Sequence, residues 1–550
     1  MRLINASTGQ LEYFFEDVPK YAILSHTWED EEVTFQEFSK LSAKAKKGYL
    51  KIERSCRVAL RHGLQYAWVD TCCIDKTSSA ELTESINSMF PWYQRAEKCY
   101  VFLSDLRSGA LAEEKLAACR WFTRGWTLQE LIAPKEVRFY DQEWNFIGTK
   151  MDFSDKISSI TGIDMSILQG TSEPNERSIA TRMSWAAHRQ TSRIEDLAYC
   201  LLGIFDVNMP LIYGEGWKAF RRLQEEIVRH SNDLTIFAWD HEIDQKQDAQ
   251  WGLFSPTPSR FAGSAFVQRY NRQTVDPEFS ITNKGLRFDR SRYLYKMNVK
   301  KAGTEVTRYA IPLGYRKDSD GTIDYSIQLR KSGPNVFLRD GKLLVENRDT
   351  SYSLQSRATR LPMINNFHIH VDTQQSPLLK FVEGIHVPKH DRVQIKEVIP
   401  ESHWDETNRM FFTPPEDHYS LVLAMFCHVT IGTAGLKTRV KVIVYILFGP
   451  TIPTSHCRIF NPSKHKEHSA WLFRHKRLGH NVTWHDIEAD LPGILKHTSE
   501  LEVFAEGEHF TISVSLSQGM VKSISEQEIY SLNFDIKLAT KEDSYRPKTR

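Results

Sequence analysis

The amino-acid sequence predicts an α/β fold near the N-terminus, then a helical extension and a mostly β C-terminal region. Up to about residue 145, short runs of β-branched and aromatic residues alternate with helical patterns, which is typical of a parallel sheet flanked by helices. Residues 151–235 have helical periodicity, and short alternating segments follow from about residue 245. Because single domains rarely exceed roughly 300 residues, we expect the 550 residues to form two or three domains, and the patterns delimit two. The first spans 1–235, with its α/β core over about 18–145, and the second spans 245–545.

Four strands are expected in the α/β core, at residues 21–24, 66–69, 99–103 and 137–140. Each is nearly continuous in hydrophobicity, as strands buried on both faces are. Polar residues follow each strand at once, and in open α/β sheets ligands bind just beyond the carboxyl ends of the strands. We therefore predict a site lined by Ser25, His26, Asp70 and Ser104. The alternative is that these residues only form the turns after buried strands.

A helix is expected between the second and third strands. Its apolar stripe consists of Leu82, Ile86, Met89 and Tyr93. Ser78 and Glu81 have the spacing of a capping box at its start. Pro91 lies inside the pattern, and a proline removes one helical hydrogen bond, so we predict that the helix kinks or ends there. Trp92 and Tyr93 would then lie on a separate turn.

The helical extension and the C-terminal half have different periodicities. Trp217, Phe220, Leu223 and Ile227 recur at helical spacing and predict an amphipathic helix that packs on the core. The later segments predict mostly antiparallel strands at 308–315, 324–330, 367–372, 421–431, 440–448, 510–516 and 532–538. No pattern assigns a role to this half, so we treat it as a binding or sensing module.

Composition excludes several classes of function. Lys and Arg total 71 against 69 acidic residues, so the chain lacks the broad positive field that nucleic-acid binding requires. No apolar run reaches the roughly 18 residues of a membrane span, and no signal peptide is present. We expect a cytoplasmic protein whose eight cysteines are reduced.

Cofactor and metal motifs are also missing from the sequence. The segment 432–438 is too short for a phosphate loop, and no esterase motif occurs. His465 and His468 lie close together in a histidine-rich stretch, but no constellation backed by a carboxylate surrounds them. We predict a solvated surface there, with no metal and no cofactor.

The most distinctive local motif is residues 120–131, RWFTRGWTLQEL. On a helix Trp126 and Glu130 are four residues apart and share a face. A ring that stacks on a base, beside a carboxylate that stabilises oxocarbenium charge, suits the hydrolysis of a nucleoside. The alternative is an ordinary amphipathic helix on which Arg120 or Arg124 pairs with Glu130 at the surface.

Several sequence blocks resemble the fungal heterokaryon incompatibility (HET) domain. They are 21–35 (YAILSHTWEDEEVTF), 63–104 and 120–131, followed by 183–186, 193–196, 199–203 and 211–216. The resemblance covers about 230 residues in matching order. Two departures stand out, because Glu29 occupies a position that is usually Gly and Pro91 replaces a helix-friendly residue. Glu29 implies a different turn or some backbone strain.

HET domains are similar to TIR domains, and this resemblance implies a TIR-like parallel sheet. In that superfamily a Trp-Cys-x-x-Glu-Leu segment carries the glutamate required for NAD cleavage, and the matching run here is 126–131 (WTLQEL). The resemblance thus implies NAD glycohydrolase chemistry with Glu130 as the catalytic carboxylate and Trp126 in support. NAD would be a substrate and not a cofactor.

The resemblance implies a role in vegetative incompatibility, in which non-self recognition triggers programmed cell death. Activation would involve homo-oligomerisation and an unidentified non-self protein partner. One alternative is a signalling scaffold whose HET domain only binds other proteins, with Glu130 in a structural ion pair. Another is a degenerate family member whose β-rich half binds a ligand for other purposes.

Overall fold

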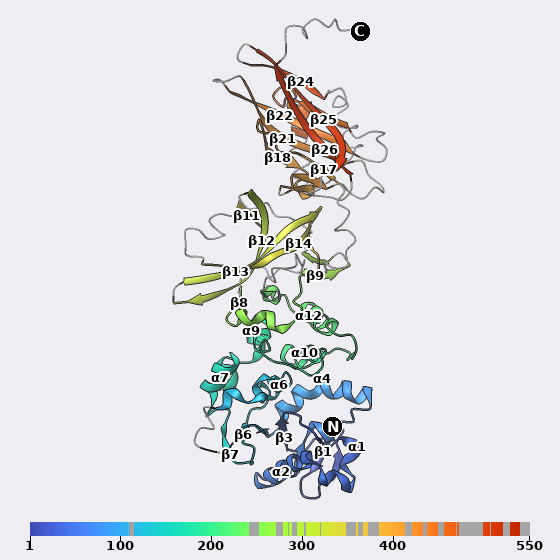
Figure 1. Ribbon diagram of the computed structural model, residues 1–550, viewed down its shortest axis with the longest axis vertical. Helices are drawn as coiled ribbons and strands as arrows, with labels where there is room; N and C mark the ends of the chain where they lie inside the picture. Colours follow the sequence, from blue (N-terminus) through green and yellow to red (C-terminus); the bar gives the residue numbers. More distant parts are fainter. Residues whose placement is uncertain are drawn as a thin grey trace.

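The computed structural model has three parts arranged along its long axis (Figure 1). It describes residues 1–240 apart from 108 and 110–114, and residues 252–538 apart from a series of segments. The longest of these are 271–278, 289–293, 348–358, 361–366, 372–383, 413–420, 449–455, 472–498 and 521–527. The N-terminal α/β part is followed by a middle sheet and then by the C-terminal sheets.

A seven-stranded sheet forms the centre of the N-terminal part. Its order is β2 (Leu11–Tyr13), β1 (Arg2–Asn5), β4 (Tyr66–Trp68), β3 (Tyr21–His26), β5 (Lys98–Phe102), β6 (Val137–Tyr140) and β7 (Phe146–Thr149). The four predicted strands β3, β4, β5 and β6 are confirmed and run parallel. The outer strands β1 and β7 pair antiparallel with β4 and β6.

The strand order reverses next to β3. The chain goes from β3 to β4 on one side, and β5 then pairs with the other side of β3. Such a reversal opens a crevice at the carboxyl ends of the strands, where ligands bind in α/β sheets. All six residues of β3 are buried, and this strand ends at Ser25 and His26.

The helices of this part are α1 (Phe35–Phe38), α2 (Lys47–Arg61), α3 (Asp70–Cys73), α4 (Ser79–Arg95) and α6 (Thr127–Ile132). Helices α4 and α6 lie on the side of the sheet that faces the rest of the chain (Figure 1). Helix α4 continues through Pro91, so the alternative that it ends there, with Trp92 and Tyr93 on a separate turn, was wrong, and a kink at Pro91 stays a prediction. Tertiary packing holds its last turn, since Trp92 and Tyr93 both contact the ring of Trp68.

The start of α4 agrees with the sequence in part. The side chain of Ser78 accepts a hydrogen bond from the backbone N–H of Glu81, as an N-cap residue does. The second half of the predicted capping box is replaced, because the Glu81 carboxylate accepts from the backbone N–H of Asp75 at 2.8 Å and pairs with Arg2.

Six helices confirm the helical extension. They are α7 (Ser154–Thr161), α8 (Met165–Leu168), α9 (Ile179–Ser184), α10 (Asp196–Tyr199), α11 (Leu202–Phe205) and α12 (Lys218–His230). Phe220, Leu223 and Ile227 on α12 are buried as predicted. Trp217 does not belong to this buried face, because it precedes α12 and is 48% exposed.

The rest of the described chain is mostly β, as predicted. The middle sheet contains β8 (Gln268–Arg269), β9 (Phe279–Thr282), β10 (Gly285–Phe288), β11 (Tyr295–Lys301), β12 (Thr304–Asp318), β13 (Gly321–Gly333), β14 (Val336–Asn347), β15 (Thr359–Arg360) and β16 (Phe367–Ile369). A six-stranded sheet contains β17 (Gly384–His386), β19 (Trp404–Asp405), β20 (Met410–Phe412), β24 (Glu500–Ala505), β25 (Glu508–Met520) and β26 (Glu528–Leu538). A four-stranded sheet contains β18 (Val393–Ile399), β21 (Leu421–Ile431), β22 (Thr438–Phe448) and β23 (His456–Phe460).

Pairing in these sheets is antiparallel except for β14 with β16 and β17 with β26. The predicted segments 308–315, 324–330, 421–431, 440–448, 510–516 and 532–538 all fall on strands, and 367–369 forms β16. Residue 372 of the predicted segment 367–372 lies outside the described residues.

Buried apolar side chains form two large clusters. One extends from Leu3 to Val371 and includes the middle sheet, and the other extends from Ile385 to Leu532. The middle sheet therefore shares its core with the N-terminal part. Within the described residues, no helix is long and apolar enough to cross a membrane. All eight cysteines are free and buried.

Candidate functional site

A cavity of about 340 Å³ lies at the carboxyl ends of β3 and β4. Its apolar wall is the stripe of α4 that was identified in the sequence, Leu82, Ile86, Met89 and Tyr93. Its polar lining includes three carboxylates, Asp70, Glu130 and Asp196, and three cations, Lys76, Arg124 and Arg193. An apolar pocket with a few convergent polar groups is the usual form of a small-molecule site.

Glu130 reaches this cavity from α6, and the residue is only 7% exposed. Its Oε2 accepts a hydrogen bond from the hydroxyl of Ser25, which accepts in turn from the indole N–H of Trp121 at 2.8 Å. The Ser25 hydroxyl thus accepts from Trp121 and donates to Glu130. Ser25 and Trp121 therefore fix the orientation of the carboxyl group.

Burial raises the pKa of Glu130 to about 8. The hydrogen bond from Ser25 opposes this rise, and the nearby charge of Asp70 adds to it. The carboxyl group is thus mainly protonated at neutral pH and ionises in mildly alkaline solution. A carboxyl whose pKa is shifted strongly in a cleft is a recurrent property of catalytic sites.

A buried arginine lies behind α6. The guanidinium of Arg189 donates to the carbonyl of Arg124 and to the hydroxyl of Thr127, each at 2.8 Å. It also donates to the carbonyl of Trp185 at 3.3 Å. Burial lowers the pKa of Arg189 to about 10, so it remains charged at neutral pH. This cation holds the first turn of the helix that carries Glu130.

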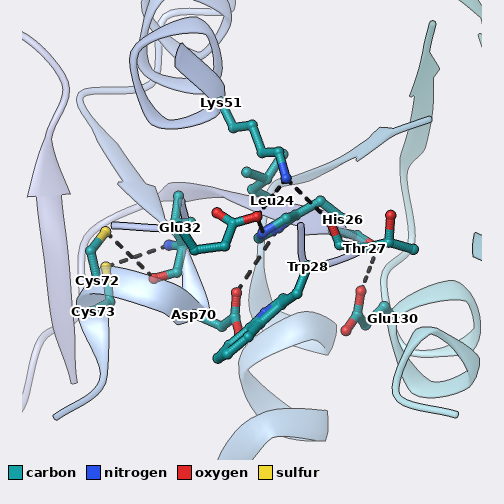
Figure 2. A network of polar contacts seen from close by, with 12 residues as sticks. Leu24, His26, Thr27, Trp28, Glu32, Lys51, Asp70, Cys72, Cys73 and Glu130 are labelled. Atoms are coloured by element: carbon teal, nitrogen blue, oxygen red, sulfur yellow. Dashed lines mark hydrogen bonds and ion pairs between the residues drawn. The ribbon is translucent and has the colours of Figure 1, made fainter. Parts of the chain in front are cut away.

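His26 and Asp70 belong to a second polar cluster beside Glu130 (Figure 2). His26 Nε2 lies 3.7 Å from Glu32, and its Nδ1 lies 4.0 Å from Asp70. Glu32 also pairs with the buried ammonium of Lys51 at 2.5 Å. His26 therefore lies between two carboxylates, one of which belongs to the cavity wall.

Trp28 and Lys76 cover the Asp70 side of the cavity. The indole N–H of Trp28 donates to Asp70 at 2.9 Å, and the Lys76 ammonium lies 3.3 Å from the same carboxylate oxygen. This ammonium is also 3.5 Å from the centre of the Trp28 ring. Trp28 is 49% exposed, so it presents an aromatic surface to solvent at the rim.

The structure brings together four of the six predicted site residues as lining of one cavity, namely His26, Asp70, Trp126 and Glu130. Ser25 does not line this cavity and lies behind Glu130 as its hydrogen-bond partner. Ser104 follows β5 and is not part of the cavity lining. Neither arginine of the alternative interpretation pairs with Glu130 among the described residues, because Arg120 contacts Asp105 and Glu29, and Arg124 contacts Ser192.

Glu29 itself does not adopt a positive φ. The residue of this loop in the left-handed region is Glu31, with a φ of 64°. The Glu29 carboxylate pairs with Lys51 at 3.1 Å and with Arg120 at 3.4 Å. These ion pairs give the side chain a role in the loop.

Sequence reasoning missed the contribution of the helical extension to the cavity. Ser192, Arg193, Asp196 and Tyr213 all line it, and Arg189 supports it from behind. Arg193, Asp196 and Tyr213 lie in sequence blocks that carry the HET resemblance, which was the available signal. Nothing in their local pattern places them opposite a helix some 70 residues earlier in the chain.

The two close histidines have a carboxylate beside them, contrary to expectation. Glu467 lies 3.9 Å from His465 Nδ1 and 3.8 Å from His468 Nε2, and the donor atoms of all three lie within 4.8 Å of one another. The signal was present in the sequence, because Glu467 directly precedes His468 and follows His465 by two residues. The absence of a metal stays a prediction.

Comparison with known proteins supports the resemblance. Residues 21–118 match the family model described as Heterokaryon incompatibility protein (HET). The N-terminal region is similar to HET proteins. Residues 218–288 match a second model, a Domain of unknown function (DUF8212). The HET match covers β3, α4 and β5 and ends before Glu130.

A curated relative extends the similarity. "Vegetative incompatibility protein HET-E-1" of Podospora anserina is 45% identical over 249 residues, which is 43% of this chain. The aligned part is only 18% of the length of that relative. No solved structure matches the chain. The relation of the HET-like region to TIR domains thus stays a prediction.

Proposed function

We propose that the HET-like region is a TIR-like NAD glycohydrolase in which Glu130 is the catalytic carboxylate. The protein would use this activity in vegetative incompatibility, where loss of NAD kills the cell after non-self recognition. The observation that carries the proposal is the position of Glu130, buried in a cavity at the reversal of strand order, with Trp126 on the same wall. The similarity to a vegetative incompatibility protein supports the biological role.

The proposed reaction breaks the bond between nicotinamide and the ribose C1′. The bonding electron pair moves into the pyridinium ring and neutralises it, so nicotinamide leaves without protonation. Positive charge develops at C1′ as an oxocarbenium ion, which the ionised carboxylate of Glu130 stabilises. Water adds to C1′, and its proton is released, giving ADP-ribose.

The other lining residues suit the rest of the dinucleotide. Lys76, Arg124 and Arg193 provide positive charge for the diphosphate, and the Trp126 ring provides a face for a base. These groups come from three different segments, which the fold brings to one cavity. Self-association of the region is proposed to complete the active state, in the cytoplasm and in response to a non-self protein.

The test is release of nicotinamide by the purified full-length chain, measured at high concentration and on a clustering scaffold. We expect turnover by the wild type, and a loss of at least about a hundredfold in Glu130→Gln, as for removal of a group that stabilises transition-state charge. Glu225→Gln is the matched control, since Glu225 lies on α12 and pairs with Arg221 outside the cavity. The rate should rise from pH 6 to 9, because ionised Glu130 is the active form and its pKa is about 8.

A signalling scaffold is the second candidate. The hydrogen bond between Ser25 and Glu130 favours this candidate, because a buried, hydrogen-bonded carboxyl group also stabilises a fold without taking part in catalysis. In that case the chain would arrest growth in cells without NAD loss, and Glu130→Gln would retain this effect. A chain that causes neither arrest nor NAD loss would fit the degenerate alternative.

A further inference from the structure

The helical extension is fixed to the start of the helix that carries Glu130. Gly125 donates its N–H to the carbonyl of Gln190 at 2.9 Å, and the N–H of Gln190 donates to the carbonyl of Thr123 at 2.7 Å. A Cβ atom at Gly125 would lie 2.5 Å from Cγ2 of Thr191, so only glycine allows this approach. The extension therefore forms part of the site, and its lining residues have a defined position relative to Glu130.

Asp196 is the carboxylate that this extension brings to the cavity. It is the first residue of α10, and its Oδ1 accepts a hydrogen bond from the hydroxyl of Tyr213 at 3.0 Å. The side chain of Trp126 lies beside Asp196 and lowers the pKa of its carboxyl group. Two aromatic side chains of the cavity lining thus flank one carboxylate.

Two cations accompany this carboxylate without pairing with it at hydrogen-bond distance. The Arg193 guanidinium lies 4.6 Å from the centre of the Tyr213 ring. Arg124 donates to the hydroxyl of Ser192 at 3.3 Å. The combination of aromatic faces, an acceptor carboxylate and cations matches the base, hydroxyl and phosphate groups of a nucleotide.

The carboxylate of Asp196 has acceptor capacity left. An ionised carboxylate offers about four acceptor positions, and its two aromatic neighbours use at most two of them. Burial raises the pKa of Asp196, and the hydrogen bond from Tyr213 and the neighbouring side chain of Trp126 oppose this rise. A pair of neighbouring sugar hydroxyls is a suitable donor set for the remaining positions.

Asp196, Trp126 and Glu130 line the same cavity. Trp126 and Glu130 are one helical turn apart and share a face of the helix. Asp196 lies beside Trp126, on the wall that the helical extension provides. A ribose bound in this cavity would therefore have both carboxylates in its surroundings.

We propose that Asp196 is a specificity-determining residue that binds the 2′- and 3′-hydroxyls of the ribose whose bond to nicotinamide is broken. The inference rests on the proposed function, in that the cavity is taken to bind this half of NAD. It adds that recognition of the sugar comes from the helical extension, and catalysis from α6. The site would then reject substrates whose ribose lacks a hydroxyl.

Binding of nicotinamide mononucleotide and of its 2′-deoxy analogue to the full-length chain tests the proposal, with calorimetry as the measurement. Glu130→Gln is the background, so that neither probe is consumed. A hydrogen bond to a charged group contributes about 1.5–3 kcal/mol, so we expect the hydroxylated probe to bind about 10- to 150-fold more tightly. Adding Asp196→Ala should bring this ratio close to one, whereas the Glu225→Gln control should leave it unchanged.

Asp196→Asn controls for the possibility that the alanine variant lowers affinity only because the pocket loses its structure. Asparagine retains an acceptor for the Tyr213 hydroxyl, so this variant should bind both probes with an intermediate ratio. An unchanged ratio in both Asp196 variants would overturn the proposal, as would a parent chain that binds neither probe.

The two proposals fail in different ways. A large affinity ratio without nicotinamide release by the wild type would refute the glycohydrolase and leave the role of Asp196 in place. Nicotinamide release with a ratio near one would refute the role of Asp196 alone.

Discussion

At the scale of single residues, the environment of Glu130 is the main feature that could not be predicted from the sequence. Sequence reasoning gave its residue type and the shared helical face with Trp126. The structure adds that Ser25 donates to it and that burial raises its pKa to about 8. These properties depend on a strand that lies about a hundred residues earlier in the chain.

The raised pKa of Glu130 predicts a pH-dependent effect on stability. A carboxyl whose folded pKa exceeds its unfolded value of about 4.5 stabilises the fold below pH 4.5, and this contribution is lost as pH rises through 8. Glu130→Gln removes the ionisable group and keeps its shape. The variant should therefore gain stability relative to the wild type between pH 5 and 8, by at most about 1.4 kcal/mol per pH unit, and the difference should level off above pH 8.

Denaturant unfolding of both chains at several pH values measures this effect. Glu225→Gln on α12 is the control and should track the wild type across the whole range. A difference between Glu130→Gln and the wild type that stays constant from pH 5 to 9 would contradict a raised pKa.

At the scale of elements, close packing between helices determines the shape of the cavity. Helix α11 crosses α4 at Gly203, where an added Cβ would lie 2.1 Å from Cβ of Phe90. The same helix α4 carries the apolar wall of the cavity. The position of the wall thus depends on a contact that lies outside the cavity lining.

Gly203→Ala should force α4 and α11 apart. We expect a destabilisation of about 1–3 kcal/mol from overpacking, together with weaker binding of nicotinamide mononucleotide as the wall shifts. Thermal unfolding and calorimetry provide the measurements. Gly263→Ala is the matched control, because its added Cβ would meet no atom within 4 Å. Equal stability of the two variants would show that this contact can relax without cost.

Pro91 shows why a prediction from local sequence rules failed for helix α4. A proline inside a helix costs one hydrogen bond, yet α4 continues to Arg95. Trp92 and Tyr93 in that last turn pack against Trp68, and the hydroxyl of Tyr21 donates to the carbonyl of Trp92 at 2.5 Å. Tertiary contacts outweigh the local penalty, and the sequence pattern does not contain them.

At the scale of the whole molecule, the middle sheet is attached to the N-terminal part through a buried cation. Arg339 on β14 donates to the carbonyls of Phe237 at 3.1 Å and Trp239 at 2.5 Å. Its guanidinium lies 3.7 Å from the centre of the Trp239 ring. Burial lowers the pKa of Arg339 to about 9, so it remains protonated at neutral pH.

Arg339→Ala should loosen this attachment. Two buried carbonyls would lose the hydrogen bonds that Arg339 donates, at a cost of about 1–3 kcal/mol for each. We expect faster hydrogen exchange and proteolysis around residues 234–239, with Lys317→Ala, an exposed position on the same sheet, as the control. Unchanged protection in this segment would mean that apolar packing alone holds the two parts together.

The sequence by itself determined the alternation of strands and helices in the α/β core, the β character of the C-terminal half and the shared helical face of Trp126 and Glu130. These features depend on periodicity and residue type within short windows, which local physical chemistry sets. The blocks that resemble HET domains also identified the family to which residues 21–118 are similar.

The tertiary structure alone decided the make-up of the site. In the structure Ser104 lies outside the cavity lining, and Ser25 lies behind Glu130 as its hydrogen-bond partner. Asp196 and Tyr213 of the helical extension line the cavity. The buried apolar side chains of the middle sheet and of the N-terminal part also form one continuous cluster. Each of these outcomes depends on contacts between segments far apart in the chain, and burial and hydrogen bonding across such contacts cannot be read from periodicity within any one segment.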